Sequence, residues 1–220
     1  MARQKHGASF ETLAPQLAAI GRRFYDRGWV LGTSGNFSAV VSRMPLRLAI
    51  TASSRPKGAL RASDILQCDD HARVVAHRGR AAGKPSAETL LHIEIARRRG
   101  AGAVLHTHSV WSTMLSDAWA SGPDAGVAIE GYEMLKGLAG VTSHEHRELV
   151  PIVDNDQDMT RLARRVGDTL DRHPDAHALL LRRHGLYTWG ESLADAERHV
   201  EILEFLFETI GRTQRGPSWR

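Results

Sequence analysis

Apolar residues recur every three or four positions in several stretches of the chain, which is the period of an amphipathic helix. Leu13, Leu17, Ile20 and Phe24 show this spacing clearly. The pattern predicts helices over residues 11–28, 88–99, 110–119, 130–136 and 193–210, and a further helix from a cap at Asp156 or Asp158 to residue 170. Ser86 is the expected N-cap of the second helix.

Shorter apolar or alternating stretches separate these helices. They predict strands over residues 37–41, 46–51, 65–68, 103–105, 150–153, 178–181 and 185–189. Helices alternate with strands, and no internal repeat or long linker divides the chain. We therefore expect one α/β domain over residues 10–210, flanked by a flexible N-terminus (1–9) and a flexible tail (211–220).

The composition is that of a soluble globular protein, with 42% hydrophobic and 25% charged residues. No apolar run reaches the roughly 18–20 residues of a membrane span, and residues 1–9 are too polar for a signal peptide. The lone Cys68 fits a reducing compartment, so we expect a cytoplasmic protein without a membrane partner. The net charge of +4 comes from scattered arginines. We expect no nucleic-acid partner, because no recognised binding module accompanies the charge.

Four of the twelve histidines form two His-x-His pairs. His106 and His108 end the apolar run 103–105, and side chains two apart on a strand point the same way, so both rings can meet one ion. His144 and His146 lie among polar residues with no strand beneath them, which favours a solvated loop. A catalytic zinc ion takes three protein ligands, and His184, just after the strand 178–181, is the best third candidate.

Two carboxylates and two polar loops have both a structural and a functional interpretation. Glu88 at a helix start is either a capping acid or a group near the metal. Glu133 is either an exposed helix residue or a catalytic acid. The loop 32–36 and the pair Ser53-Ser54 are either ordinary turns or phosphate-binding loops that offer N–H and hydroxyl groups.

Taken together, five segments in this order resemble the class II aldolase/adducin family: GTSGNFS (32–38), TASS (51–54) with Lys57-Gly58, KPSAET (84–89), GAVLHTHS (102–109) and RRHGLYTWG (182–190). The resemblance extends from about residue 10 to residue 210. Three further stretches, PSAETLLH (85–92), EMLKG (133–137) and RHGLYTWGE (183–191), point to dehydratases within that family.

The resemblance implies an αβα fold around a mainly antiparallel sheet. It also implies one Zn²⁺ on His106, His108 and His184, and a homotetramer with sites near the subunit interfaces. Glu133 matches the acid/base position of the dehydratases, and Glu88 matches the metal-proximal carboxylate of the aldolases. The phosphate of the substrate would contact the polar side chains Asn36, Ser53, Ser54 and Ser86, although Ser53-Ser54 replaces the more usual Thr/Ser-Gly pair.

The implied activity is that of a hydro-lyase that dehydrates a methylthio-substituted ketopentose phosphate in methionine salvage. The alternatives are an aldolase or epimerase acting on a sugar phosphate, which shares the metal site, and a non-catalytic adducin-like interaction domain. The last alternative predicts loss of the metal ligands, whereas all three histidine candidates are present.

Overall fold

The computed structural model describes residues 8–75, 83–122 and 125–213. The five α-helices of this part of the chain are α1 (Phe10–Asp26), α2 (Thr89–Arg99), α3 (Val110–Ala118), α4 (Met159–Arg172) and α5 (Leu193–Thr213). The strands are β1 (Asn36–Arg43), β2 (Leu46–Thr51), β3 (Ile65–Asp69), β4 (Ala103–Thr107), β5 (Gly126–Ile129), β6 (Glu148–Val153), β7 (Ala178–Leu181) and β8 (Gly185–Gly190). Three 3-10 turns complete the described part: η1 (Lys57–Ala59), η2 (Ala62–Asp64) and η3 (Glu133–Gly137).

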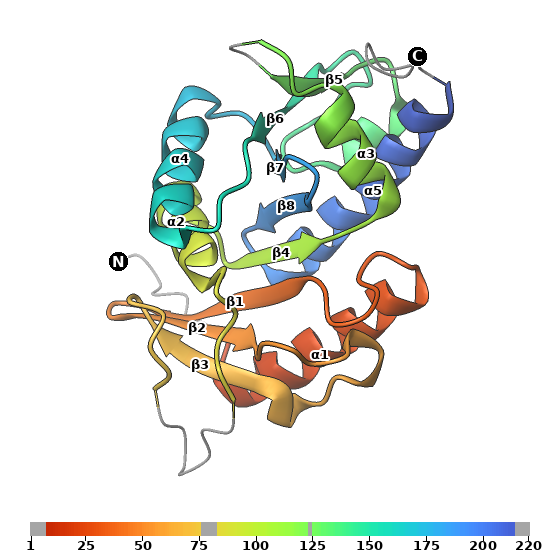
Figure 1. Ribbon diagram of the computed structural model, residues 1–220. Helices are drawn as coiled ribbons and strands as arrows, with labels where there is room; N and C mark the ends of the chain where they lie inside the picture. The colour runs from red at the N-terminus through yellow and green to blue at the C-terminus, as the bar shows by residue number, and fades with distance from the viewer. Residues whose placement is uncertain (1–7, 76–82, 123–124, 214–220) are drawn as a thin grey trace, which may run out of the picture.

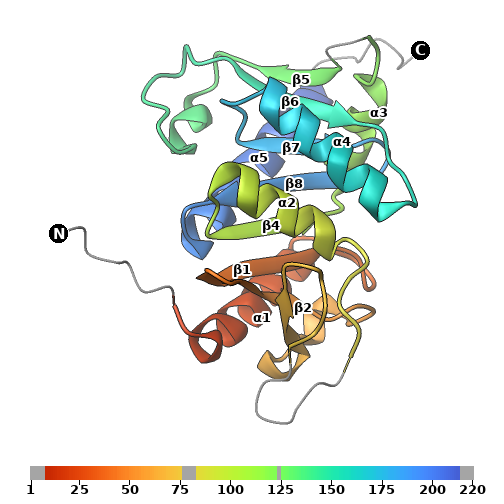
Figure 2. The same cartoon turned by 90° about the vertical axis from the view of Figure 1, so that its left-hand side faces the viewer.

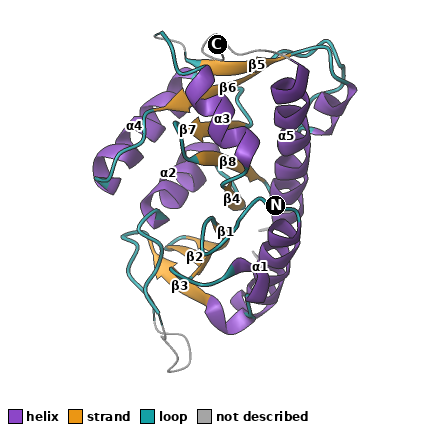
Figure 3. Ribbon diagram, turned by 45° about the vertical axis from the view of Figure 1, so that its right-hand side comes forward, coloured by secondary structure: helices purple, strands orange, loops and turns teal. Residues whose placement is uncertain are grey.

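The strands form one sheet in the order β3-β2-β1-β4-β8-β7-β6-β5. Each neighbouring pair is antiparallel except β6 and β7, which are parallel. Helices cover both faces of the sheet, with α2 and α4 on one side and α3 and α5 on the other (Figure 1). Figure 2 shows α2 and α4 in front of the strands, and Figure 3 shows α1 and α5 along the opposite side. The fold is thus the α/β architecture with a mainly antiparallel sheet that the resemblance implies.

Apolar side chains fill the space on each side of the sheet. The apolar stripe of α1, including Leu17 and Phe24, packs with the first turns of α5 against β1, β2 and β4. On the other face, Leu91 and Ile95 of α2 meet Leu162 of α4 over β4, β7 and β8. The middle of the sheet is therefore buried on both faces, which holds β4 and β8 rigidly at the centre of the molecule.

The predicted elements are largely present, with two differences and one additional strand. The additional strand is β5, which was not predicted because its four residues are too few to show a period. The predicted helix over 130–136 is only the short η3, since Gly131 has φ +79° and breaks a regular helix before it. The second helix starts at Thr89 with Glu88 in the N-cap position, whereas Ser86 accepts a hydrogen bond from the Glu88 N–H at 3.3 Å.

The ends of the domain also differ slightly from expectation. Ser9 is ordered as the N-cap of α1 and accepts a hydrogen bond from the N–H of Thr12. α5 continues to Thr213, three residues into the expected tail. The expected flexibility of residues 1–7 and 214–220 lies outside the described residues. Within the described ranges, none of the helices combines the length and the apolar character that a membrane span requires.

Candidate metal centre

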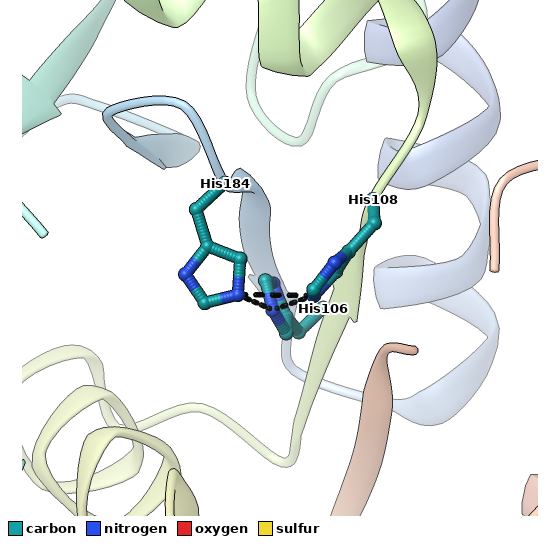
Figure 4. A group of neighbouring side chains, drawn as sticks. All are labelled: His106, His108 and His184. Atoms are coloured by element: carbon teal, nitrogen blue, oxygen red, sulfur yellow. Dashed lines mark hydrogen bonds between the residues drawn. The ribbon is translucent and has the colours of Figure 1, made fainter. Parts of the chain in front are cut away.

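Three imidazole rings meet at one point beside the centre of the sheet (Figure 4). The Nε2 atoms of His106 and His108 lie 2.7 Å apart. The Nε2 atom of His184 lies 3.3 Å from that of His106 and 3.1 Å from that of His108. The structure therefore brings together the three histidines that the sequence proposes as ligands.

The local backbone explains this convergence. His106 lies in β4, and the main chain holds His108 in place through a 2.8 Å hydrogen bond from its N–H to the Trp29 carbonyl. His184 lies in the turn between β7 and β8, directly after Arg183 at φ +55°. Gly185 follows, and a Cβ atom there would lie 2.0 Å from the carbonyl oxygen of Thr107. Only glycine lets β8 approach β4 this closely.

The electrostatics of the cluster suit a cation. His106 is fully buried, and its Nδ1–H donates to the Leu186 carbonyl at 2.8 Å, which leaves the Nε2 lone pair directed at the other two rings. Burial lowers the pKa of His106 far below its ordinary value and that of His108 to about 3. Burial also lowers the pKa of His184. Neutral rings with converging lone pairs are the ligand form of histidine, so the three residues fit a divalent metal ion.

Glu88 completes the surroundings of the cluster. Its Oε1 lies 3.3 Å from His184 Nε2, and its Oε2 lies 3.6 Å from His106 Nε2. Its side chain makes no capping hydrogen bond to α2. The carboxylate therefore faces the histidines, which supports the functional interpretation of this residue over the capping one.

A buried polar network fixes the orientation of Glu88. The amide nitrogen of Asn36 donates to Glu88 Oε2 at 2.5 Å and to the Ser86 hydroxyl at 3.2 Å. The amide oxygen of Asn36 accepts from Nε2 of His92, whose Nδ1 lies 2.8 Å from the Ser38 hydroxyl. His92 is fully buried. The sequence gives this residue no functional signal, because a lone histidine on a helix has no ligand pattern around it.

The histidine cluster opens into a cavity of about 150 Å³. Besides Glu88, His108 and His184, its lining includes all four expected phosphate-binding residues, namely Asn36, Ser53, Ser54 and Ser86. Ser54 takes φ +59°, which turns the backbone of this loop sharply, and the Ser53 and Ser54 hydroxyl oxygens lie 3.5 Å apart. The structure thus gathers small polar side chains from three separate segments on one side of the histidine cluster.

Lys57 is a cavity-lining residue to which the sequence interpretation gave no role. It is 1% exposed, and its Nζ donates to the carbonyls of Thr33 at 2.9 Å and Arg55 at 3.0 Å. Burial lowers the pKa of its ammonium group to about 8, against the opposing attraction of Glu88. The ammonium group therefore ties together the two polar loops that flank the cavity and adds positive charge beside them.

Glu133 lies apart from this group within one chain. Its side chain is 71% exposed and forms ion pairs with Lys136 and, at 3.8 Å, with Nδ1 of His144. Among the described residues that line the cavity, Glu133 is absent. A single chain therefore brings together Glu88, the expected phosphate-binding residues and the histidines, but it does not bring Glu133 to them.

The second His-x-His pair does not join the cluster either. His144 has a 57% exposed side chain next to Glu133, as expected for a solvated loop. His146 points elsewhere and lies 2.9 Å from the buried carboxylate of Glu148. The loop interpretation therefore describes His144 well and His146 incompletely.

The fold and the metal centre define a member of a known class. Residues 15–210 match the family model described as the class II aldolase and adducin N-terminal domain, so the chain belongs to that family. It is 50% identical over 204 residues to the methylthioribulose-1-phosphate dehydratase of Methylococcus capsulatus, a match that covers 92% of this chain and 95% of the relative. The enzyme of the same name from Pseudomonas fluorescens is 45% identical, with 93% and 94% covered.

Solved structures share the architecture. YgbL from Escherichia coli, described as a putative aldolase/epimerase/decarboxylase, superposes with a TM-score of 0.76 at 26% identity, covering 94% of this chain and 92% of that one. An L-fuculose 1-phosphate aldolase superposes with a TM-score of 0.74 at 21% identity, with 96% and 92% covered. At this identity, the likeness to the aldolase shows the fold alone.

Proposed function

We propose that the chain is a zinc-dependent hydro-lyase that converts 5-methylthioribulose 1-phosphate into 5-methylthio-2,3-dioxopentyl 1-phosphate, a step of methionine salvage. The observation that carries this proposal is the convergence of His106, His108 and His184 beside Glu88, in a chain 50% identical to a dehydratase of that name. A non-catalytic adducin-like domain has no need of such a ligand set.

His106, His108 and His184 would hold the metal ion. Three imidazoles are the set expected of a catalytic zinc site that keeps one position open. A divalent ion bound there supplies positive charge beside the C2 carbonyl of the substrate and thereby makes the C3 proton easier to remove. The Leu186 carbonyl fixes the ring of His106, so the protein spends no free energy on reorienting this ligand.

The proton transfers are assigned to carboxylates. Glu133 takes the proton from C3 and returns it to the C4 hydroxyl, whose bond to C4 breaks as water leaves; the resulting enol then tautomerises to the diketone. Glu88, held by Asn36, contributes negative charge next to the histidines and orients the hydroxyl groups of the substrate. A residue that accepts and then returns one proton leaves the enzyme ready for the next turnover.

The cavity beside the metal ligands is assigned to the phosphate group. Ser53, Ser54 and Ser86 supply hydroxyl donors, Asn36 holds the Ser86 hydroxyl in place, and Lys57 adds a positive charge behind them. Anchoring the phosphate at one end of the substrate fixes the distance from C1 to the reacting carbons, which is a large part of the catalytic advantage of a bound substrate.

We further propose that the active unit is a homotetramer. The supporting observation is the exposed position of Glu133, because a carboxylate that lies outside the cavity of its own chain acts there only if a neighbouring copy supplies it. Exposed apolar residues on α3, Val110 and Met114, follow closely after the metal ligands and offer surface for such a contact. The free, buried Cys68 supports a cytoplasmic location.

Product analysis by mass spectrometry tests the activity. The zinc-loaded protein should convert methylthioribulose 1-phosphate into a product lighter by one water. Retro-aldol cleavage of fuculose or rhamnulose phosphate, assayed in parallel, is the activity expected of the aldolase alternative. Cleavage without dehydration would reject the proposal in favour of an aldolase, and neither reaction in a zinc-loaded protein would reject both.

A further inference from the structure

A second group of metal-binding side chains shares no residue with the histidine cluster. It lies where β6 and β7 begin and consists of His146, Glu148 and His177. One ligand atom of each lies within 4.8 Å of the others. His146 Nε2 and His177 Nδ1 each lie 2.9 Å from Oε2 of Glu148, which is 1% exposed. Two imidazoles therefore converge on a single buried carboxylate oxygen.

The hydrogen bond made by the other ring nitrogen of His177, Nε2, indicates what Nδ1 presents to Glu148. Its Nε2–H donates to the carbonyl of Ala139 at 2.8 Å, so in the neutral ring Nδ1 carries a lone pair directed at Glu148. A lone pair and a carboxylate oxygen 2.9 Å apart repel each other unless a proton or a metal ion lies between them. Histidines that bind metals commonly donate their other N–H to a carbonyl, and His106 shows the same arrangement through Leu186.

The carboxylate has the features of a ligand as well. Oε1 of Glu148 accepts the backbone N–H of His177 at 2.9 Å, which leaves Oε2 for the cluster. A buried carboxylate oxygen that two imidazoles approach is a ligand atom that zinc accepts.

His199 borders the group without joining it. Its ring lies 5.6 Å from that of His177 at 85°, with Nδ1–H donating to the Trp189 carbonyl at 2.7 Å and Nε2 accepting from the Ala139 N–H at 3.0 Å. Both of its nitrogens are thus occupied. The side chains of His146 and His177 are 29% and 16% exposed, which leaves room for solvent beside the three candidate ligands.

We propose that His146, Glu148 and His177 form a second site for a divalent transition-metal ion of the zinc class, with solvent as the remaining ligand. Two imidazoles and one carboxylate are a donor set that zinc accepts. The ion links the first residue of β6, the residue before β7 and the loop that precedes β6, so its role is structural. A proton held by the same three side chains is the other occupant of this space, and metal analysis separates the two.

Equilibrium dialysis of metal-free protein against micromolar free Zn²⁺, followed by elemental analysis, tests the site. The wild-type chain should bind one ion more than His146→Gln, because glutamine at this half-exposed position removes one of only three ligands. His144→Gln, an exposed replacement two residues away in the same loop, should bind as many ions as the wild type. Circular dichroism of each variant confirms that it is folded before its metal is counted.

The number of metal ions bound at this second site does not depend on the proposed catalytic function. His184→Ala should lose the catalytic ion and still bind the second one, and His184→Ala combined with His146→Gln should bind none. Equal metal counts in the wild type and folded His146→Gln would overturn the proposal and leave a hydrogen-bonded cluster. His177→Gln, at the residue before β7, provides a second test, since replacing the buried Glu148 itself risks unfolding the chain.

Discussion

The ring of Tyr187 stacks on the imidazole of His106, with ring centroids 3.9 Å apart and 13° between their planes. The two residues are register partners on the antiparallel strands β8 and β4. Tyr187 is fully buried, so its ring forms one wall that fixes the orientation of His106, a candidate metal ligand. Packing and the hydrogen bond to Leu186 therefore preorganise this imidazole for metal binding.

Replacement of Tyr187 should separate packing from chemistry. Tyr187→Phe keeps the stacked ring, and we expect it to keep the metal and to change the free energy of unfolding by less than about 1.5 kcal/mol. Tyr187→Ala leaves a cavity against His106 and should cost roughly 3–5 kcal/mol. Urea unfolding measures both values. A Phe variant as damaged as the Ala variant would show that the hydroxyl, rather than the ring, supports the site.

Removal of one histidine ligand should abolish activity through loss of metal. His184→Ala leaves two imidazoles, and we expect its turnover to fall to background while the fold remains. His71→Ala, whose side chain is 67% exposed, should behave like the wild type. Metal content and dehydration rate are measured on the same samples. Full turnover by folded His184→Ala would contradict the assignment of this ligand.

Glu133→Gln should lower turnover by about 10²–10⁴-fold without loss of the catalytic ion, because the amide accepts no proton. Glu130→Gln provides the matched control, since Glu130 lies three residues earlier and its side chain is 67% exposed. Mixed tetramers of Glu133→Gln with His184→Ala should regain part of the activity if a neighbouring copy supplies the carboxylate. Wild-type rates for Glu133→Gln would remove Glu133 from the mechanism.

Lys57 is expected to act on substrate binding. Lys57→Met removes the ammonium group beside the cavity, so KM should rise by more than kcat falls. Lys84→Met, at an exposed position outside the cavity lining, is the control. Because burial lowers the pKa of Lys57 to about 8, the affinity of the free enzyme for substrate should weaken as the pH rises above 8. Steady-state kinetics between pH 7 and pH 9 test this, and an unchanged KM in Lys57→Met would exclude the role.

Glu204 should make stability depend on pH. This residue of α5 is 2% exposed, and one of its oxygens accepts from the Thr107 hydroxyl at 2.6 Å. Burial raises its pKa from 4.5 to about 7, despite hydrogen bonds from Ser109 and Thr107. A raised folded-state pKa contributes stability that is complete below pH 4.5 and is lost as the pH rises through 7, because the folded state resists ionisation.

Glu204→Gln cannot ionise and should therefore be more stable than the wild type above pH 7. At about 1.4 kcal/mol per pKa unit, the gain is on the order of 3 kcal/mol at most. The difference should shrink steadily towards pH 4.5. Urea unfolding of both proteins at several pH values measures it with the same metal load. A difference that is constant with pH would show that Glu204 does not titrate in this range.

Local sequence predicts the elements whose pattern is long enough to read. The stripe from Leu13 to Phe24 predicts α1, and the apolar run before His106 predicts β4. The bounds of η3 and β5 could not be predicted in this way, because four or five residues around glycines show no clear hydrophobic period. For the site, the His-x-His pair at the end of an apolar run points to two candidate ligands, and only the position of His184 after a strand points to the third.

The amino-acid sequence indicates an α/β domain and two candidate ligands at the end of β4, because periodicity within one segment is a local property. Its motifs also indicate the family. The proximity of groups that are distant along the chain is visible only in the folded molecule. The fold joined His92 to Glu88 through Asn36, buried Lys57 between two loops, and left Glu133 outside its own cavity. It also placed the His146 ring within 2.9 Å of the Glu148 carboxylate. These relationships depend on how β1, β4 and β8 align in one sheet and how helices pack upon it, and spacing within a single segment does not encode that alignment.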